Sequence, residues 1–69
     1  MRYAVLFERS GDGYGAYVPD LPGCIAAAES YGETVKLIHE AIEFHIEGML
    51  LHGEHVPAPT TLAELVEVG

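Results

Sequence analysis

The longest periodic stretch of this 69-residue sequence predicts one amphipathic helix between Ser30 and Gly53. Ser30 and Glu33 have the spacing of a capping box, in which a serine hydroxyl and a glutamate carboxylate satisfy free amides at a helix start. Gly53 is a typical helix terminator, and prolines follow it. Apolar residues recur at helical spacing along one side, at Val35, Ile38, Ile42 and Met49. A chain this short has room for one small core around that helix and for no second domain.

Short strand-like runs precede the helix. Residues 3–7 are aromatic, β-branched or small, and Asp12-Gly13 is a dipeptide favoured in tight hairpin turns. Residues 14–18 then predict a returning strand. The segment 19–23 contains two prolines that interrupt the pattern, and residues 24–29 predict a third strand despite their alanines. The expected class is therefore α+β, with a small antiparallel sheet covered on one face by the helix.

The C-terminal segment gives mixed signals. Thr61-Leu62-Ala63-Glu64 fits a second capping box, whereas Leu65-Val66-Glu67-Val68 alternates weakly like a strand. We expect one short helical turn followed by an edge strand. The whole chain, residues 1–69, then forms one β-β-β-α-β domain.

Composition excludes several classes of protein. Three basic against eleven acidic residues give a net charge of −8, which disfavours nucleic-acid binding and favours a basic protein partner. A hydrophobic content of 49 % is too high for a disordered acidic tail. The single cysteine argues against a disulfide-stapled secreted protein, and no run of apolar residues is long enough for a signal peptide or a membrane span. A cytoplasmic location fits these features best.

The candidate catalytic and metal-binding residues form no recognisable motif. The histidines, which are His39, His45, His52 and His55, lack the His-Glu-x-x-His spacing of a zinc site. Cys24 has small apolar neighbours, a setting that makes a thiol inert rather than nucleophilic. Gly11, Gly13 and Gly15 lack the spacing of a dinucleotide-binding loop, and a strand rather than a helix follows them. We therefore expect no metal and no cofactor.

A second apolar line on the helix has two interpretations. It runs through Leu37, Ala41, Phe44 and Leu51, away from the first line. It would either widen the face that contacts the core or form a patch for self-association. The second interpretation predicts a homo-oligomer with an interface at Leu37, Phe44 and Leu51.

The residues between the second and third strands carry a resemblance to a known family. Residues 17–24 read Y-V-P-D-L-P-G-C, and a capped helix with a Pro-x-Pro segment follows. Over nearly its whole length the chain resembles the HicB-like antitoxins, whose signature P-D-L-P-G-C matches Pro19 to Cys24. Ala41, Leu51 and residues 57–59 add weaker support.

The resemblance implies a β-β-β-α-β fold of a degraded RNase H-like or double-stranded-RNA-binding-like kind. It implies a non-enzymatic protein that binds a small basic HicA-type mRNA interferase toxin and covers its catalytic histidine. Many family members also repress their own operon through a C-terminal DNA-binding domain. The 69 residues leave no room for that domain, so we expect no direct contact with nucleic acid.

We expect the partner to contact the signature loop and nearby side chains, while a row of glutamates on the helix attracts it electrostatically. The predicted partner-binding residues are Tyr17, Asp20, Leu21, Pro22, Gly23, Cys24, Glu40, Glu43 and Glu47. In the alternative interpretation of this loop, its prolines form only a rigid strand connection. An alternative function is a weak metal-dependent ribonuclease, in which Asp12, Asp20 and Glu29 would have to converge on a divalent cation.

Overall fold

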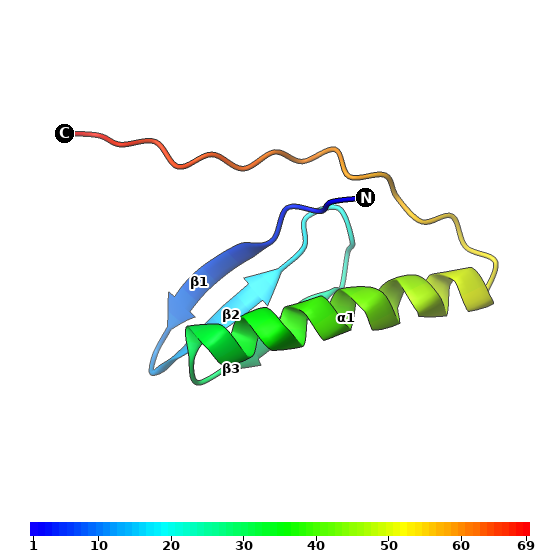
Figure 1. Cartoon of the computed structure of the whole chain (residues 1–69), viewed down its shortest axis with the longest axis horizontal. Coiled ribbons are helices and arrows are strands. Elements are labelled where there is room, and N and C mark those ends of the chain that lie inside the picture. Colours follow the sequence, from blue (N-terminus) through cyan, green and yellow to red (C-terminus); the bar gives the residue numbers. More distant parts are fainter.

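The computed structural model describes residues 1–69 and has two layers, a three-stranded sheet and one helix (Figure 1). The elements follow the order β1 (Leu6–Ser10), β2 (Gly13–Tyr17), β3 (Ile25–Ala28) and α1 (Tyr31–Leu51). The strands lie in sequence order and both pairings are antiparallel. The predicted α+β class is confirmed. No helix combines the length and the apolar character needed to cross a bilayer.

The hairpin turn between β1 and β2 lies one residue earlier than the sequence suggested. Ser10 pairs with Gly13, so the turn residues are Gly11 and Asp12 rather than Asp12 and Gly13. Gly11 has a φ of 57°, as the first central residue of a type II′ hairpin turn requires. Gly13 allows the close approach of β3, because a Cβ at that position would lie 2.6 Å from the carbonyl oxygen of Ala28.

The first strand begins later than predicted. The ladder starts at Leu6, opposite Tyr17, the last residue of β2. Residues 3–5 therefore have no partner on β2 and extend past the sheet.

Helix α1 has the predicted ends. The Ser30 hydroxyl accepts a hydrogen bond from the Glu33 amide at 3.1 Å and donates one to the Glu33 carboxylate at 2.9 Å, which forms the capping box. At the other end Gly53 has a φ of 69°, and the amides of Gly53 and Glu54 donate to the carbonyls of Leu50 and Met49. These two bonds form a Schellman motif and stop the helix.

The core lies between the sheet and the helix and is small. Its five buried hydrophobic residues are Ala16, Val18, Leu21, Cys24 and Ile38. Thr34 is also fully buried, and its hydroxyl donates to the Ser30 carbonyl at 2.8 Å. Ala41 of the second apolar line packs against this core, as the interpretation that this line widens the core-facing side of the helix expects for that residue.

The C-terminal segment forms neither the short helical turn nor the edge strand that the sequence suggested. Residues 54–69 have no regular structure and run back past the N-terminus beside β1 (Figure 1). Two contacts hold the first part of this segment. The Tyr3 hydroxyl donates to the Pro57 carbonyl at 2.5 Å, and Thr60 and Thr61 bind Asp20. Residues 62–69 follow these contacts and join no strand ladder.

Candidate partner-binding site

The signature loop is built from two consecutive β-turns. The Leu21 amide donates to the Val18 carbonyl and the Cys24 amide to the Leu21 carbonyl, each at 3.0 Å. A proline occupies the second position of each turn, where its fixed φ is suited to the geometry. Gly23, at the third position of the second turn, has a φ of 85°, which is the value that a type II turn needs there. The sequence P-D-L-P-G-C thus specifies the backbone of this loop.

Two side chains of the loop point inward. Leu21, where the two turns meet, is completely buried, and Cys24 is 3 % exposed. Burial also raises the pKa of the Cys24 thiol, so it stays neutral at physiological pH. Both side chains fill the core and hold the loop in place, and the predicted contact of these two residues with a partner stays a prediction.

Asp20 binds the C-terminal segment. Its carboxylate accepts hydrogen bonds from the amides of Thr60 and Thr61 at 3.0 and 2.9 Å, and from their hydroxyls at 3.1 and 2.8 Å. These bonds, with the Thr61 amide first, lower the pKa of Asp20. We call this arrangement the Asp20 clamp. The carboxylate that we expected to meet a partner is occupied within its own chain.

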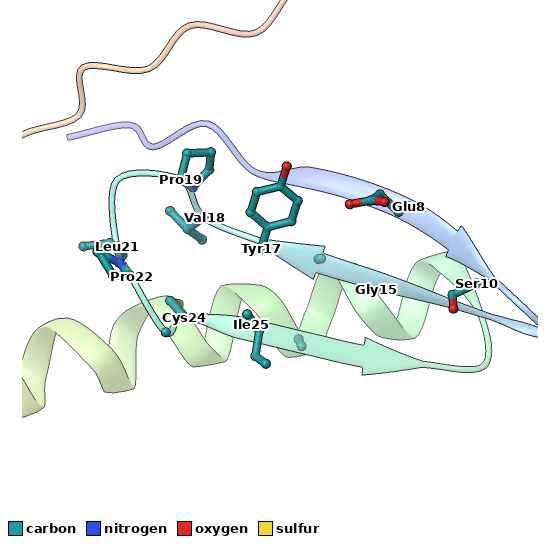
Figure 2. Close-up of a pocket in the computed structure, with 13 residues that line it drawn as sticks. Glu8, Ser10, Gly15, Tyr17, Val18, Pro19, Leu21, Pro22, Cys24 and Ile25 are labelled. Carbon is teal, nitrogen blue, oxygen red and sulfur yellow. The ribbon is translucent and has the colours of Figure 1, made fainter.

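The exposed side of the sheet, opposite α1, forms a shallow apolar depression next to this loop (Figure 2). Strand residues alternate between the two sides of a sheet, so buried Ala16 faces the helix and Tyr17 faces away from it. The depression has a volume of about 640 Å³. We call it the open face and define it by Glu8, Ser10, Gly15, Tyr17, Pro19, Pro22 and Ile25.

The open face is shaped by the contrast between small and large residues. Gly15 leaves the middle of β2 without a side chain, while Tyr17 lies opposite Ile25 on the neighbouring strand. Ile25 is 69 % exposed. Glu8 is the one charged residue that lines the depression. An exposed apolar pair beside a rigid loop, with a carboxylate at its border, is suited to contact with an apolar and basic protein surface.

The structure separates the predicted partner-binding residues. Tyr17 and Pro22 lie together at the open face, and Gly23 also lines the depression. Glu40, Glu43 and Glu47 are exposed on α1, in the layer that covers the other side of the sheet. The glutamates can therefore contribute to the field around the molecule but do not border the open face.

Leu37, Phe44 and Leu51 repeat every seven residues along the outer surface of α1. Their side chains are all exposed, Phe44 by 79 %. An oligomer interface at these residues stays a prediction.

Sequence reasoning missed Ile25 and Glu8. Both could have been found from strand alternation, because Ile25 pairs with Tyr17, and Glu8 with Gly15. Thr60 and Thr61 were missed because nothing in a single sequence couples them to a residue 40 positions earlier. No group of three histidine, cysteine or acidic residues lies close enough to hold a metal ion, so Asp12, Asp20 and Glu29 do not form the cluster that a nuclease would need.

Comparison with known proteins agrees with this description of the loop. The profile of a family described as HicB-like antitoxin of bacterial toxin-antitoxin systems matches residues 3–68. The chain belongs to the HicB-like antitoxin family. The family signature corresponds to the double turn that borders the open face.

Relatives come from phage, bacteria and archaea. A 14.9 kDa protein from the rep-hol intergenic region of Haemophilus phage HP1 is 39 % identical over 66 residues, which cover 96 % of this chain and 50 % of that protein. The chain thus spans about half the length of this relative. A UPF0150 protein of Synechocystis is 41 % identical over 58 residues, covering 83 % of this chain and 71 % of that protein. A UPF0150 protein of Thermoplasma acidophilum is 38 % identical over 58 residues, covering 83 % of this chain and 84 % of that protein.

Proposed function

We propose that this chain is an antitoxin that binds a small basic toxin of the HicA-type mRNA interferase class through its open face. The observation that carries the proposal is that the family signature builds the loop at the border of an exposed apolar depression. The protein acts by covering the toxin rather than by catalysis, in the cytoplasm where the toxin meets mRNA.

Two properties of the surface support a basic partner. The net charge of −8 attracts cationic proteins over a distance of about one Debye length, roughly 8 Å at physiological ionic strength. Glu40, Glu43 and Glu47 add to this field without lying on the open face. In this proposal they accelerate the encounter, and the apolar contacts of the open face set the lifetime of the complex.

The contact itself centres on Tyr17 and Ile25. Binding energy at protein interfaces concentrates in a few large side chains that become fully desolvated, and tyrosine is frequent among them. The loop next to Tyr17 is held rigid by two turns, so little conformational entropy is lost when a partner packs against it.

A neutralisation assay tests the proposal. Cells that express a HicA-type toxin should resume growth when this chain is co-expressed, and calorimetry should show a complex of the two purified proteins. Ile25→Ser should weaken binding by about tenfold or more, as expected for a central interface residue.

Leu50→Ser is the matched control. Leu50 is 65 % exposed, close to the 69 % of Ile25, but it lies at the end of α1 away from the open face. Equal loss of affinity in the two variants would contradict the assigned surface. Absence of any complex, together with RNA cleavage by the purified chain in the presence of Mg²⁺, would overturn the antitoxin proposal in favour of the ribonuclease alternative.

A further inference from the structure

Glu8 is the one carboxylate that lines the depression on the open face. Its position on β1 pairs with Gly15 on β2, and both residues line the side of the sheet opposite α1 (Figure 2). Glycine has no side chain, and a Cβ added at residue 15 would have no atom closer than the Ala26 carbonyl oxygen at 3.9 Å. The floor beside Glu8 is therefore bare backbone, with room for a side chain from another molecule.

Tyr17 forms one wall of this space. It is the next residue of β2 on the same side as Gly15, which makes it a diagonal neighbour of Glu8. Diagonal positions on antiparallel strands are about 7–8 Å apart, within reach of an aromatic or a long side chain. Ser10, two residues after Glu8 on β1, lines the same depression and adds a hydroxyl. A carboxylate, an aromatic ring and a hydroxyl thus surround the backbone of Gly15.

The chain has no cation of its own for Glu8. Its three basic residues are Arg2, Arg9 and Lys36. Arg9 lies over the Tyr14 ring, 5.8 Å from its centroid, and strand alternation places it on the other side of the sheet. Lys36 belongs to α1, which covers that other side, and Arg2 lies beyond the end of β1, six residues before Glu8. A cation for Glu8 must therefore come from another molecule.

Covering the open face changes the energetics of Glu8. A partner that packs on Tyr17 and Ile25 also removes water from the neighbouring carboxylate. A carboxylate that loses its water without gaining a partner is strongly unfavourable. The partner must therefore bring a positively charged group to this position. A second copy of this chain, with a net charge of −8, has few such groups, so the open face favours a basic protein instead.

We propose that the space over Gly15 is a subsite for one arginine side chain of the partner, in which Glu8 binds the guanidinium and the Tyr17 ring stacks on it. This inference rests on the proposed function, because it concerns the same open face. Arginine is better suited than lysine, since its planar guanidinium donates two hydrogen bonds to one carboxylate while it stacks on an aromatic ring. Its aliphatic stem packs against Ile25, and the Ser10 hydroxyl accepts a further hydrogen bond.

Calorimetry with a HicA-type toxin tests the subsite in the complex. Glu8→Gln should weaken binding by about tenfold or more, as expected for one partner of a desolvated charge pair. Glu43→Gln is the matched control, since it removes the same charge from the exposed surface of α1, and it should weaken binding by less than about threefold. In 1 M salt, where the Debye length is about 3 Å, the effect of Glu8→Gln should persist, because a desolvated pair is screened much less than an exposed one.

A second experiment uses the chain without any toxin. In nuclear magnetic resonance spectra of the labelled chain, N-acetyl-arginine methylamide should shift the amide signal of Gly15. N-acetyl-citrulline methylamide, which has nearly the same shape without the charge, should not shift it. Glu8→Gln should abolish the shift, and Glu43→Gln should retain it. The far-ultraviolet spectrum of each variant checks that the fold is intact.

The two experiments separate the arginine subsite from the antitoxin proposal. If the toxin binds the wild-type chain and Glu8→Gln with equal affinity, the subsite is overturned and the open face stands. If no toxin binds, the antitoxin proposal fails and the arginine compound decides the subsite. A Gly15 shift that depends on Glu8 then supports the subsite, whereas equal shifts with the arginine and citrulline compounds, or no shift with either, overturn it.

Discussion

Leu21 is the residue on which the signature loop most depends. It lies where the two turns meet, its side chain is completely buried, and it contacts the core beneath the loop. Leu21→Ala removes three carbon atoms from that core. At about 0.8 kcal/mol for each buried methylene, the lost transfer free energy is about 2.4 kcal/mol. The cavity left behind adds to this, and buried leucine-to-alanine changes cost about 2.7–5 kcal/mol in total.

This loss is large for so small a domain. At about 0.05–0.15 kcal/mol per residue, a chain of 69 residues is expected to have a free energy of unfolding of about 3–10 kcal/mol. Leu21→Ala should therefore remove a large part of the total stability, and a protein near the lower limit should be mostly unfolded. Urea denaturation followed by circular dichroism measures the change as a lower midpoint with an unchanged slope.

The same substitution at an exposed leucine is the control. Leu50→Ala changes the same atoms at a site that is 65 % exposed, and it should alter the free energy of unfolding by less than about 0.5 kcal/mol. If Leu21→Ala costs less than about 1 kcal/mol, or if the two variants cost the same, then the argument that the loop is anchored through Leu21 is refuted.

Three further predictions concern the loop and the sheet. Because the clamp lowers the pKa of Asp20, the stabilising effect of the clamp is complete above the ordinary pKa of 3.8 and disappears as the pH falls through the lower pKa of the folded state. Asp20→Asn should remove this part of the acid dependence of the unfolding free energy, and an unchanged dependence at acidic pH would contradict the prediction. Because burial raises the pKa of Cys24, a thiol reagent at neutral pH should modify the native protein much more slowly than the urea-unfolded chain, and equal rates would show that the core is open. Gly13→Ala should cost about 1–3 kcal/mol in urea denaturation because its Cβ would meet the backbone of Ala28, whereas Gly15→Ala, with 3.9 Å to the nearest atom, should cost less.

The elements that local sequence determines were predictable. The helix start and stop depend on Ser30, Glu33 and Gly53, which act over a few residues, and the structure has both ends as expected. The signature loop is equally local, because its prolines and Gly23 fix two adjacent turns. The hairpin differed by one residue because both Gly11-Asp12 and Asp12-Gly13 are good turn dipeptides, and the strand register decides between them.

The parts that depend on distant contacts were not predictable from one sequence. Asp20 has the chemistry of an exposed partner-binding carboxylate, and only the folded chain brings the two threonines to it. The final segment alternates like a strand, but alternation alone supplies no pairing partner, and residues 62–69 join no ladder in the structure. The open face was found in part, since Tyr17 and Pro22 were predicted whereas Ile25 was assigned only to a strand.

The Asp20 clamp makes the signature loop sensitive to residues far from it in the chain. It links residue 20 to residues 60 and 61 without a covalent bond, so the loop and the C-terminal segment lose one shared restraint when the clamp opens. Substitution of Thr60 or Thr61 would thus give the loop more conformational freedom and increase the entropy that a partner must remove on binding. An antitoxin could in this way lose affinity through a change at a position that its partner never touches.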